Sequence, residues 1–127
     1  MDLNLELPGD HYFIRSQDEQ GIRIGDKFHT QSLIISAGHL ITGWEPADLD
    51  ELQDQHLLPI FELKPEILLL GTGDLQRFLP PKMQVSIYEK GIGVEVMTTK
   101  AACSTFNVLV SEGRIVVAAL MQQHISP

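Results

Sequence analysis

The fold is decided by the stretch from Gly91 to Met121, "GIGVEVMTTKAACSTFNVLVSEGRIVVAALM". Its first part, "IGVEVM" (92–97), alternates apolar residues with others, which is the period of a β-strand. The middle part, "TTKAACSTFNVLVSEG" (98–113), begins with threonine caps, carries an apolar stripe at helical spacing and closes on a glycine, as an α-helix does. The last part, "RIVVAALM" (114–121), is an apolar run typical of a buried strand. A strand, a helix and a strand in this order predict parallel strands joined by a right-handed crossover.

The same alternation of elements extends upstream to residue 66. The run from Ile67 to Leu70 is continuously apolar, as expected of a strand covered on both faces. Pro80-Pro81 places a proline at a helix start, and Gly91 is a suitable residue to close the helix that reaches Lys90. Residues 66–121 are therefore predicted to form a βαβαβ unit.

The first third of the chain is typical of short strands joined by tight turns. "HYFIRS" (11–16) is followed by a polar turn at 17–21, and "IRIGDKFH" (22–29) contains the hairpin pair Gly25-Asp26. "QSLIISAGHLITGW" (31–44) adds two more apolar runs around Ala37-Gly38. These residues are predicted to form an antiparallel meander.

The segment "PADLDELQDQHLLP" (46–59) changes to a helical period. Leu49, Leu52 and His56 recur at helical spacing, Asp48 can cap the helix, and Pro59 is expected to end it. We interpret His56 as a hydrogen-bonded histidine at the edge of the core. The fold class is thus α/β: a single domain (1–127) with a mixed β-sheet, in which a strand-rich hairpin part (1–46) precedes a helix and the βαβαβ unit (47–127).

Composition limits the classes of function. The chain has 127 residues and a net charge of −8; residues 1–66 hold 13 acidic and 4 basic residues, and residues 67–127 hold 4 and 5. An acidic chain with scattered cations lacks the positive stripe that nucleic acid requires, so we expect no nucleic-acid partner. The single Cys103 excludes an intrachain disulfide and a zinc finger, and no two histidines have metal-ligand spacing, so we expect no metal site.

The sequence also carries an expectation about location. The longest apolar run, 115–121, is far shorter than the roughly 20 residues that span a bilayer, so no direct membrane insertion is expected. The N-terminal segment "MDLNLELPGD" lacks the basic and apolar regions of a signal peptide. We therefore expect a cytoplasmic protein.

The candidate site lies where the parallel strands end, because ligands of open α/β sheets collect beyond the carboxyl ends of the strands. If the two strands are neighbours, both following loops line one crevice. The second loop also opens a helix, whose free N–H groups and dipole favour an anion. The candidate ligand-binding residues of the two loops are Gly71, Thr72, Gly73, Thr98, Thr99 and Lys100.

The Gly-x-Gly turn of this crevice does not predict a nucleotide cofactor. "GTGDLQ" has Gln76 where the dinucleotide fingerprint needs its third glycine, and Asp74 places a negative charge where a pyrophosphate would lie. No Gly-Lys-Ser/Thr follows, which excludes a Walker loop. We expect no cofactor, and we interpret the glycines as allowing a sharp exit from a buried strand.

Two further residues of the candidate site have alternative interpretations. Glu95 lies opposite Val94 and Val96 on its strand, so it either faces a cavity or sits at a sheet edge or beside a cation. Cys103 is near a helix N-terminus, which favours a thiolate, but it also lies beside the apolar stripe, which favours a buried structural thiol. No catalytic constellation can be recognised around either residue.

The chain resembles a known family, the small Mth-type "adipogenesis-associated" domain that also forms the body of a mitochondrial respiratory complex I assembly factor. The matching stretches are "LLLGTG" (68–73), "GIGVEVMTTKAACSTFNVL" (91–109) and "EGRIVVAAL" (112–120), and "LITGW" upstream fits as well. The resemblance implies a three-layer fold on a central mixed sheet. It also implies a role as an assembly partner, because the mitochondrial relative acts as one without a known reaction. The family's bacterial members have no established activity.

The loop after the second strand departs from the family pattern. Thr98 stands where an acid is usual, Lys100 replaces a glycine, Ser104 an arginine and Phe106 a tyrosine. These differences fall on the rim of the crevice, so a ligand shared across the family does not carry over to this chain.

Two functions remain as hypotheses. The first is a non-enzymatic protein-interaction or complex-assembly factor, with a membrane or respiratory complex as the partner by family analogy. The second is a small-molecule or anion-binding protein, and possibly an enzyme, that uses the crevice at the carboxyl ends of the parallel strands.

Overall fold

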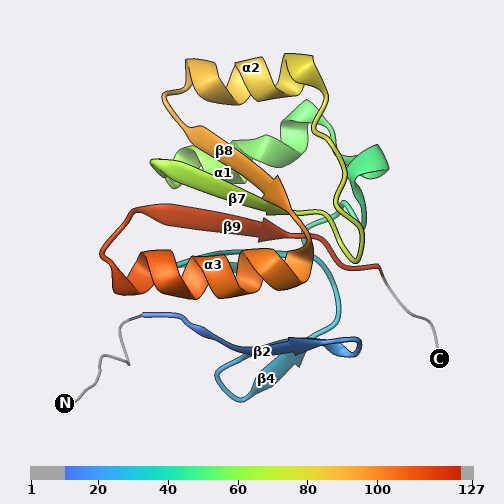
Figure 1. Cartoon of the computed structure of the whole chain (residues 1–127), viewed down its shortest axis with the longest axis vertical. Coiled ribbons are helices and arrows are strands. Elements are labelled where there is room, and N and C mark those ends of the chain that lie inside the picture. Colours follow the sequence, from blue (N-terminus) through green and yellow to red (C-terminus); the bar gives the residue numbers. More distant parts are fainter. Residues whose placement is uncertain (1–10, 124–127) are drawn as a thin grey trace.

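The computed structural model describes residues 11–123, and its centre is a mixed five-stranded sheet (Figure 1). The strand order is β6-β5-β9-β7-β8. β9 runs parallel to β7 and antiparallel to β5, and β7 runs parallel to β8. The strands are β5 (Leu33–Ser36), β6 (Leu40–Thr42), β7 (Ile67–Gly71), β8 (Gly93–Met97) and β9 (Val116–Leu120). The predicted α/β class with a mixed sheet and a βαβαβ unit is confirmed.

A second, three-stranded sheet precedes the central one. It is an antiparallel meander of β2 (Ile14–Asp18), β3 (Gly21–Ile24) and β4 (Lys27–His29). The prediction of one meander through residue 44 is therefore wrong. The reason is burial: β5 is covered on both faces and takes an interior position beside β9, whereas β4 leaves Phe28 half exposed and ends the small sheet.

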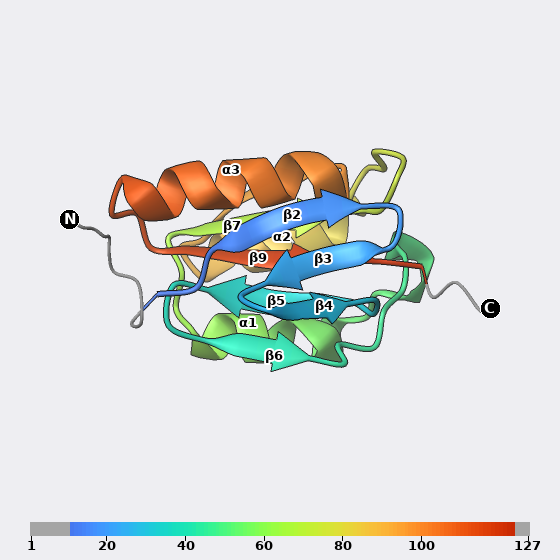
Figure 2. The same ribbon diagram turned by 90° about the horizontal axis from the view of Figure 1, so that it is seen from below.

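The elements stack in three layers, as the family resemblance implies. Figure 1 shows α2 (Pro81–Glu89) on one side of the central sheet and α3 (Thr99–Ser111) with the small sheet on the other. In Figure 2, β2, β3 and β4 lie in front of the central sheet and beside α3. Alternate residues of β7 supply the two cores: Leu68 and Leu70 pack toward the α2 side, and Leu69 packs toward α3 and the small sheet.

The helices of the βαβαβ unit begin and end where the sequence predicts. The Thr98 hydroxyl accepts a hydrogen bond from the Ala101 backbone N–H at the start of α3 (3.2 Å). Gly91 and Gly113 follow α2 and α3 with φ of 80° and 78°, the left-handed conformation that suits glycine after a helix.

The segment 46–59 is not the single helix that its spacing predicts. It forms two 3₁₀ turns, η2 (Leu49–Glu51) and η3 (Asp54–Leu57), which lead into the short helix α1 (Leu58–Glu62). Asp48 caps η2 as expected, because its carboxylate accepts from the Glu51 N–H. Pro59 does not end a helix; it lies in the first turn of α1, where its missing N–H needs no partner.

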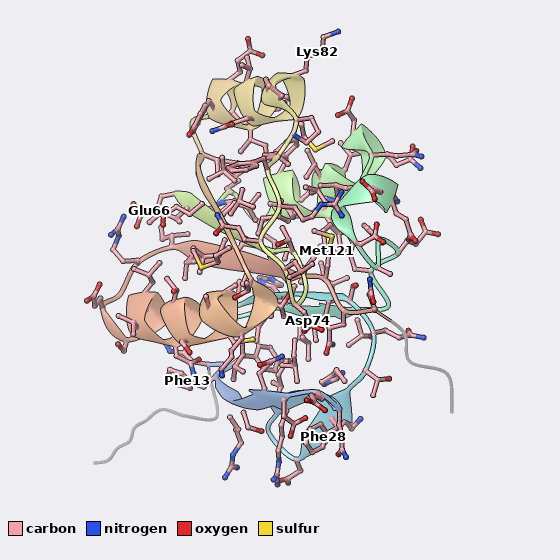
Figure 3. All side chains as sticks on the ribbon, turned by 45° about the vertical axis from the view of Figure 1, so that its right-hand side comes forward. Phe13, Phe28, Glu66, Asp74, Lys82 and Met121 are labelled. Atoms are coloured by element: carbon pink, nitrogen blue, oxygen red, sulfur yellow. The ribbon has the colours of Figure 1, made fainter. Side chains whose placement is uncertain are left out.

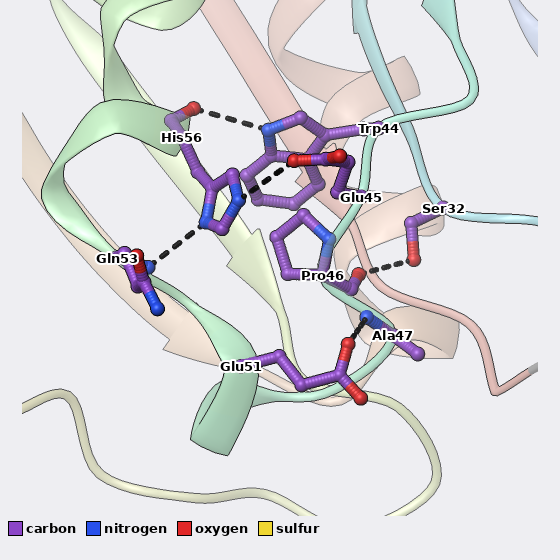
Figure 4. Close-up of polar contacts among 8 residues, drawn as sticks. All are labelled: Ser32, Trp44, Glu45, Pro46, Ala47, Glu51, Gln53 and His56. Carbon is purple, nitrogen blue, oxygen red and sulfur yellow. Dashed lines mark hydrogen bonds and ion pairs between the residues drawn. The ribbon is translucent and has the colours of Figure 1, made fainter.

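A polar cluster around His56 holds this segment to the end of β6 (Figure 4). The Gln53 backbone N–H donates to His56 Nδ1 (2.9 Å), so the ring proton of the neutral imidazole is on Nε2, which lies 3.3 Å from Glu45 Oε1. Trp44 Nε1–H donates to the His56 carbonyl (3.0 Å). The interpretation of His56 as a hydrogen-bonded residue at the core edge is confirmed.

The small sheet is attached to α3 by one side-chain amide. Asn107 Oδ1 accepts from the Ile14 N–H (2.9 Å), and Asn107 Nδ2 donates to the Ile14 carbonyl (2.7 Å). Asn107 thereby pairs with β2 at the point where β2 and β3 shift register, between Ile14 and Ser16.

Within residues 11–123, no helix combines the length and the apolar character needed to cross a bilayer. The N-terminal segment on which the expectation about a signal peptide rests, residues 1–10, lies outside the described residues.

Candidate functional site

The two loops of the predicted crevice lie side by side. β7 and β8 pair in parallel with Gly71 opposite Met97, so both strands end at the same edge of the sheet. Backbone hydrogen bonds connect the loops that follow: the Thr72 N–H donates to the Met97 carbonyl (2.9 Å), and the Thr99 N–H donates to the Gly73 carbonyl (3.0 Å). The prediction that neighbouring strands bring these loops together is confirmed.

A hollow of about 490 Å³ lies at this edge of the sheet, which is the size range of small-ligand pockets. Its floor comes from Thr72, Gly73 and Thr99, together with the residues after β9. One wall is the turn between β2 and β3, and another is the loop between β7 and α2. A smaller adjoining hollow, of about 340 Å³, has Thr98 and Lys100 on its rim. Figure 3 shows Asp74 and Met121 close to each other at these strand ends.

The polar groups of the floor are already used within the protein. Thr99 is 3% exposed, and its hydroxyl accepts from the Gly73 N–H (2.8 Å) and donates to the Met121 carbonyl (2.7 Å). In α3, the Ala101 N–H is capped by Thr98 and the Thr99 N–H is bonded to Gly73. The N–H groups on which an anion site would rely are therefore largely taken.

Gly71 allows the start of α3 to approach β7. A Cβ at this position would lie 2.9 Å from both Thr99 Cα and Thr99 Oγ1, and 3.2 Å from Leu120 Cδ2. Only glycine fits such a contact without displacement of backbone. Its role in this structure is close packing of a helix on a strand.

The larger hollow is lined by carboxylates. Asp18 is the last residue of β2 and Glu19 belongs to the turn that follows, whereas Asp48 comes from the cap of η2 and Asp74 from the β7–α2 loop. Arg77, which also lines it, forms an ion pair with Asp50 (Nη2 to Oδ1, 2.7 Å). Concentrated negative charge of this kind opposes a small anion.

Sequence reasoning did not find Asp18, Glu19 and Asp48 as residues of the site. They are far along the chain from the β7 and β8 loops, and their placement depends on how the small sheet packs on the central one. The available signal was the acidity of residues 1–66, which supply all three.

Two candidate residues lie away from the crevice. Glu95 is exposed on β8, the edge strand of the sheet, which agrees with the edge interpretation. Cys103 is buried among Phe106 and other core residues, and burial raises the pKa of its thiol to about 12. The burial of Cys103 agrees with its interpretation as a structural thiol, and its low reactivity stays a prediction. Ligand binding by the remaining candidate residues stays a prediction.

In the part of the chain that the structure describes, no three histidine, cysteine, aspartate or glutamate side chains converge to hold a metal ion.

The loop between β7 and α2 presents large apolar side chains to solvent. Phe78 is 90% exposed and Leu75 is 74% exposed, and Leu75 also lines the larger hollow. Val85 and Tyr88 of α2 add two half-exposed apolar side chains farther along. Exposed apolar side chains that gather on one loop mark a possible interaction site, so the loop is a second candidate for function.

Comparison with known proteins identifies the family. The family model described as "Protein of unknown function (DUF498/DUF598)" matches residues 14–121. Among curated proteins, the chain is 37% identical over 118 residues to "NADH dehydrogenase [ubiquinone] 1 alpha subcomplex assembly factor 3" of Xenopus tropicalis, covering 91% of this chain and 63% of that protein. The chain spans 45% of the length of the Bos taurus counterpart. It is also 34% identical over 94 residues to the "13 kDa major membrane protein" of Francisella tularensis subsp. holarctica (strain LVS), with 73% and 75% of the two chains covered.

Solved structures agree with the fold described above. An NMR structure of a Xanthomonas campestris protein is 35% identical, with a TM-score of 0.84, over 100% of this chain and 96% of that one. A Bordetella pertussis protein described as a "Mth938-like domain" has a TM-score of 0.82 over 98% and 96% of the two chains; at 23% identity it shows the fold alone. With a family match that runs from β2 to the end of β9, the chain belongs to the DUF498/DUF598 family of proteins of unknown function.

Proposed function

We propose that this chain is a non-enzymatic protein-interaction domain that serves in the assembly of a larger complex. The observation that carries the proposal is the β7–α2 loop, which holds Phe78 at 90% exposure and Leu75 at 74% exposure on a fixed backbone. Aromatic side chains with this accessibility are typical anchors of protein interfaces, where a few residues supply most of the binding energy.

The loop is held in place by one bond within itself and by bonds to two other parts of the molecule, β8 and η2. The Thr72 hydroxyl donates to the Leu75 carbonyl (2.8 Å), Gln76 Nε2 donates to the Val96 carbonyl (3.2 Å), and Arg77 is paired with Asp50. Leu79, next to Phe78, is buried in the core. A loop fixed in this way loses little conformational entropy on binding, which favours recognition of a partner.

The names of relatives support an assembly role without defining the partner. The Xenopus tropicalis relative is named as an assembly factor of NADH dehydrogenase, and the Francisella relative is named as a membrane protein. Because this chain spans only part of the former, the finer statement, that it assists a respiratory or other membrane complex, is part of the proposal.

The alternative of a small-molecule protein has the 490 Å³ hollow in its favour. The hypothesis that the ligand is an anion is weakened by the carboxylates around the hollow. The hydroxyl of Thr99 is also unavailable to a ligand, because both of its hydrogen bonds are made within the fold. The exposed loop gives the assembly function the stronger physical basis.

The test is affinity capture of the tagged full chain from its native cells, after mild crosslinking and with membranes solubilised, followed by mass spectrometry. The variant Phe78→Ser is compared with Phe28→Ser, which removes another exposed aromatic side chain, 49% exposed, from the small sheet. We expect a reproducible partner that is lost with Phe78→Ser and kept with Phe28→Ser. The purified partner should then bind directly to the purified chain and to its Phe28→Ser variant, and it should not bind to the Phe78→Ser variant.

The proposal would be refuted by a partner that binds both variants as well as the unchanged protein. Turnover of a metabolite by the purified chain, without any partner, would also contradict it.

A further inference from the structure

We infer that the β7–α2 loop and the hollow beside it receive a cationic, partly apolar segment of a partner protein, with lysine or arginine side chains in the hollow and a large apolar side chain against Leu75 and Phe78. This inference rests on the proposed function and adds the chemistry of the partner. We call the binding surface the acidic groove: the hollow of about 490 Å³ together with Leu75 on its rim and Phe78 three residues further on.

The groove combines apolar and anionic groups from separate parts of the chain. Leu75 lines the hollow and is largely exposed, so it offers apolar area at the rim. Asp18, Glu19 and Asp74 are exposed carboxylates that line the same hollow and come from two separate parts of the chain. A segment that brings only apolar side chains would leave these charges unpaired, whereas a cationic segment pairs them.

The charge of the groove is not neutralised from within. Arg77 is the one cation that lines the larger hollow among the described residues, and its guanidinium is bound to Asp50 at 2.7 Å. Lys100 lines the smaller hollow together with Asp18, Glu19 and Asp74, so it is a second cation near these carboxylates. Four carboxylates still outnumber Lys100 and the engaged Arg77, and the complement of this surface is positive.

Two of the carboxylates are held in orientation by the backbone. Asp18 Oδ1 accepts from the Gln20 N–H (2.8 Å) and from the Gly21 N–H (3.3 Å), and Asp48 Oδ1 accepts from the Glu51 N–H (3.3 Å). The groove thus presents fixed negative charges, which speed the encounter with a cationic partner and make binding depend on salt.

The negative charge of the groove also determines which class of macromolecule can bind there. Nucleic acid and anionic lipid headgroups carry the same sign as the groove and are repelled. The occupant is a polypeptide segment with lysine or arginine beside leucine-like or aromatic residues.

The test uses fluorescence anisotropy with the full chain and two labelled probes: a short peptide that alternates lysine and leucine, and the same peptide with glutamate in place of lysine. The groove variant is Asp18→Asn/Glu19→Gln/Asp74→Asn, which keeps the shape of each side chain and one of its two acceptor oxygens. The matched control is Glu62→Gln/Glu89→Gln/Glu112→Gln, which changes the net charge equally at exposed positions that do not line the groove.

We expect the lysine peptide to bind and the glutamate peptide not to bind. The groove variant should bind the lysine peptide about tenfold more weakly, since three exposed charge pairs are lost, and the control should change the Kd less than twofold. Equal weakening by both variants would show that only the overall charge matters and would overturn the inference. Binding that survives unchanged in the groove variant would overturn it as well.

A second measurement separates this inference from the proposed function. The partner captured from cells is tested against the groove variant and against Phe78→Ser. Loss of binding with both supports the inference. Loss with Phe78→Ser alone overturns the cationic chemistry and leaves the assembly function standing, and loss with neither overturns both. Self-association of the unchanged chain that is lost in the groove variant would instead assign the groove to a second copy, and would also overturn the inference.

Discussion

Replacement of Thr99 by valine tests whether the floor of the crevice is structural. Valine has nearly the same shape but no hydroxyl, so Thr99→Val leaves the Gly73 N–H and the Met121 carbonyl without their partner at 2.8 and 2.7 Å. Each unpaired polar group in a buried position costs about 1–3 kcal/mol. Because Gly73 is only half buried and can recruit water, we expect a loss of about 2–4 kcal/mol in the free energy of unfolding, a large part of the about 5–15 kcal/mol that stabilises a domain.

The assay is urea unfolding followed by the fluorescence of Trp44, the only tryptophan of the chain. With a slope of about 2 kcal/mol per molar, the unfolding midpoint should fall by roughly 1–2 M. Thr99→Ser keeps the hydroxyl and should lose only about 1 kcal/mol, for the missing methyl group. Thr105→Val, on the same helix, should change stability by less than about 0.5 kcal/mol. A loss below about 1 kcal/mol for Thr99→Val, or equal losses for valine and serine, would refute the account of this hydroxyl.

Three more predictions follow from single contacts. Burial raises the pKa of the Cys103 thiol to about 12, so the native protein should react with a thiol reagent at pH 8 only as fast as it unfolds; prompt reaction without denaturant would contradict this. Asn107→Leu removes both bonds to Ile14 and should cost about 1–3 kcal/mol, with faster amide exchange in β2 than in β9; uniform exchange changes would argue against a local attachment. Two hydrogen bonds hold the pKa of Glu66 below its usual value of about 4.3: the larger effect comes from the Arg114 side chain and the smaller one from the Ile115 N–H. The stability from this pair is therefore present above that usual value and lost as the pH falls through the lower pKa of the folded state; an NMR titration of Glu66 in Arg114→Gln should move its midpoint upward, and an unchanged midpoint would exclude the pair as the cause.

Local signals explain which parts of the fold could be predicted from the sequence. Gly91 and Gly113 mark helix ends that depend only on neighbouring residues, and Thr98 caps its own helix. The prediction of a single helix over 46–59 was wrong because its local signals are ambiguous. Apolar residues three and four apart fit both 3₁₀ turns and an α-helix, and a proline can begin a helix as well as end one.

Long-range pairing explains what could not be predicted. Leu33 lies opposite Leu120 in the sheet, and no turn or spacing near Leu33 indicates a partner so far along the chain. The composition of the groove was missed for a related reason, since Asp18 and Glu19 reach it only through the packing of the small sheet. The crevice itself could be predicted, because the meeting of parallel strands at one edge is a general property of such sheets.

The position of β9 has a consequence for the synthesis of the protein. It is the middle strand of the five, yet it follows every other described element along the chain. Until residues 116–120 have left the ribosome, β5 with β6 and β7 with β8 are two separate pairs, and each exposes an apolar edge where β9 will be inserted. Nascent chains cannot close this sheet progressively from the N-terminus, as multidomain proteins do domain by domain. Ribosomes that pause before Val116 therefore hold an intermediate with two strand edges open to misassembly, and this intermediate is where a chaperone would be needed.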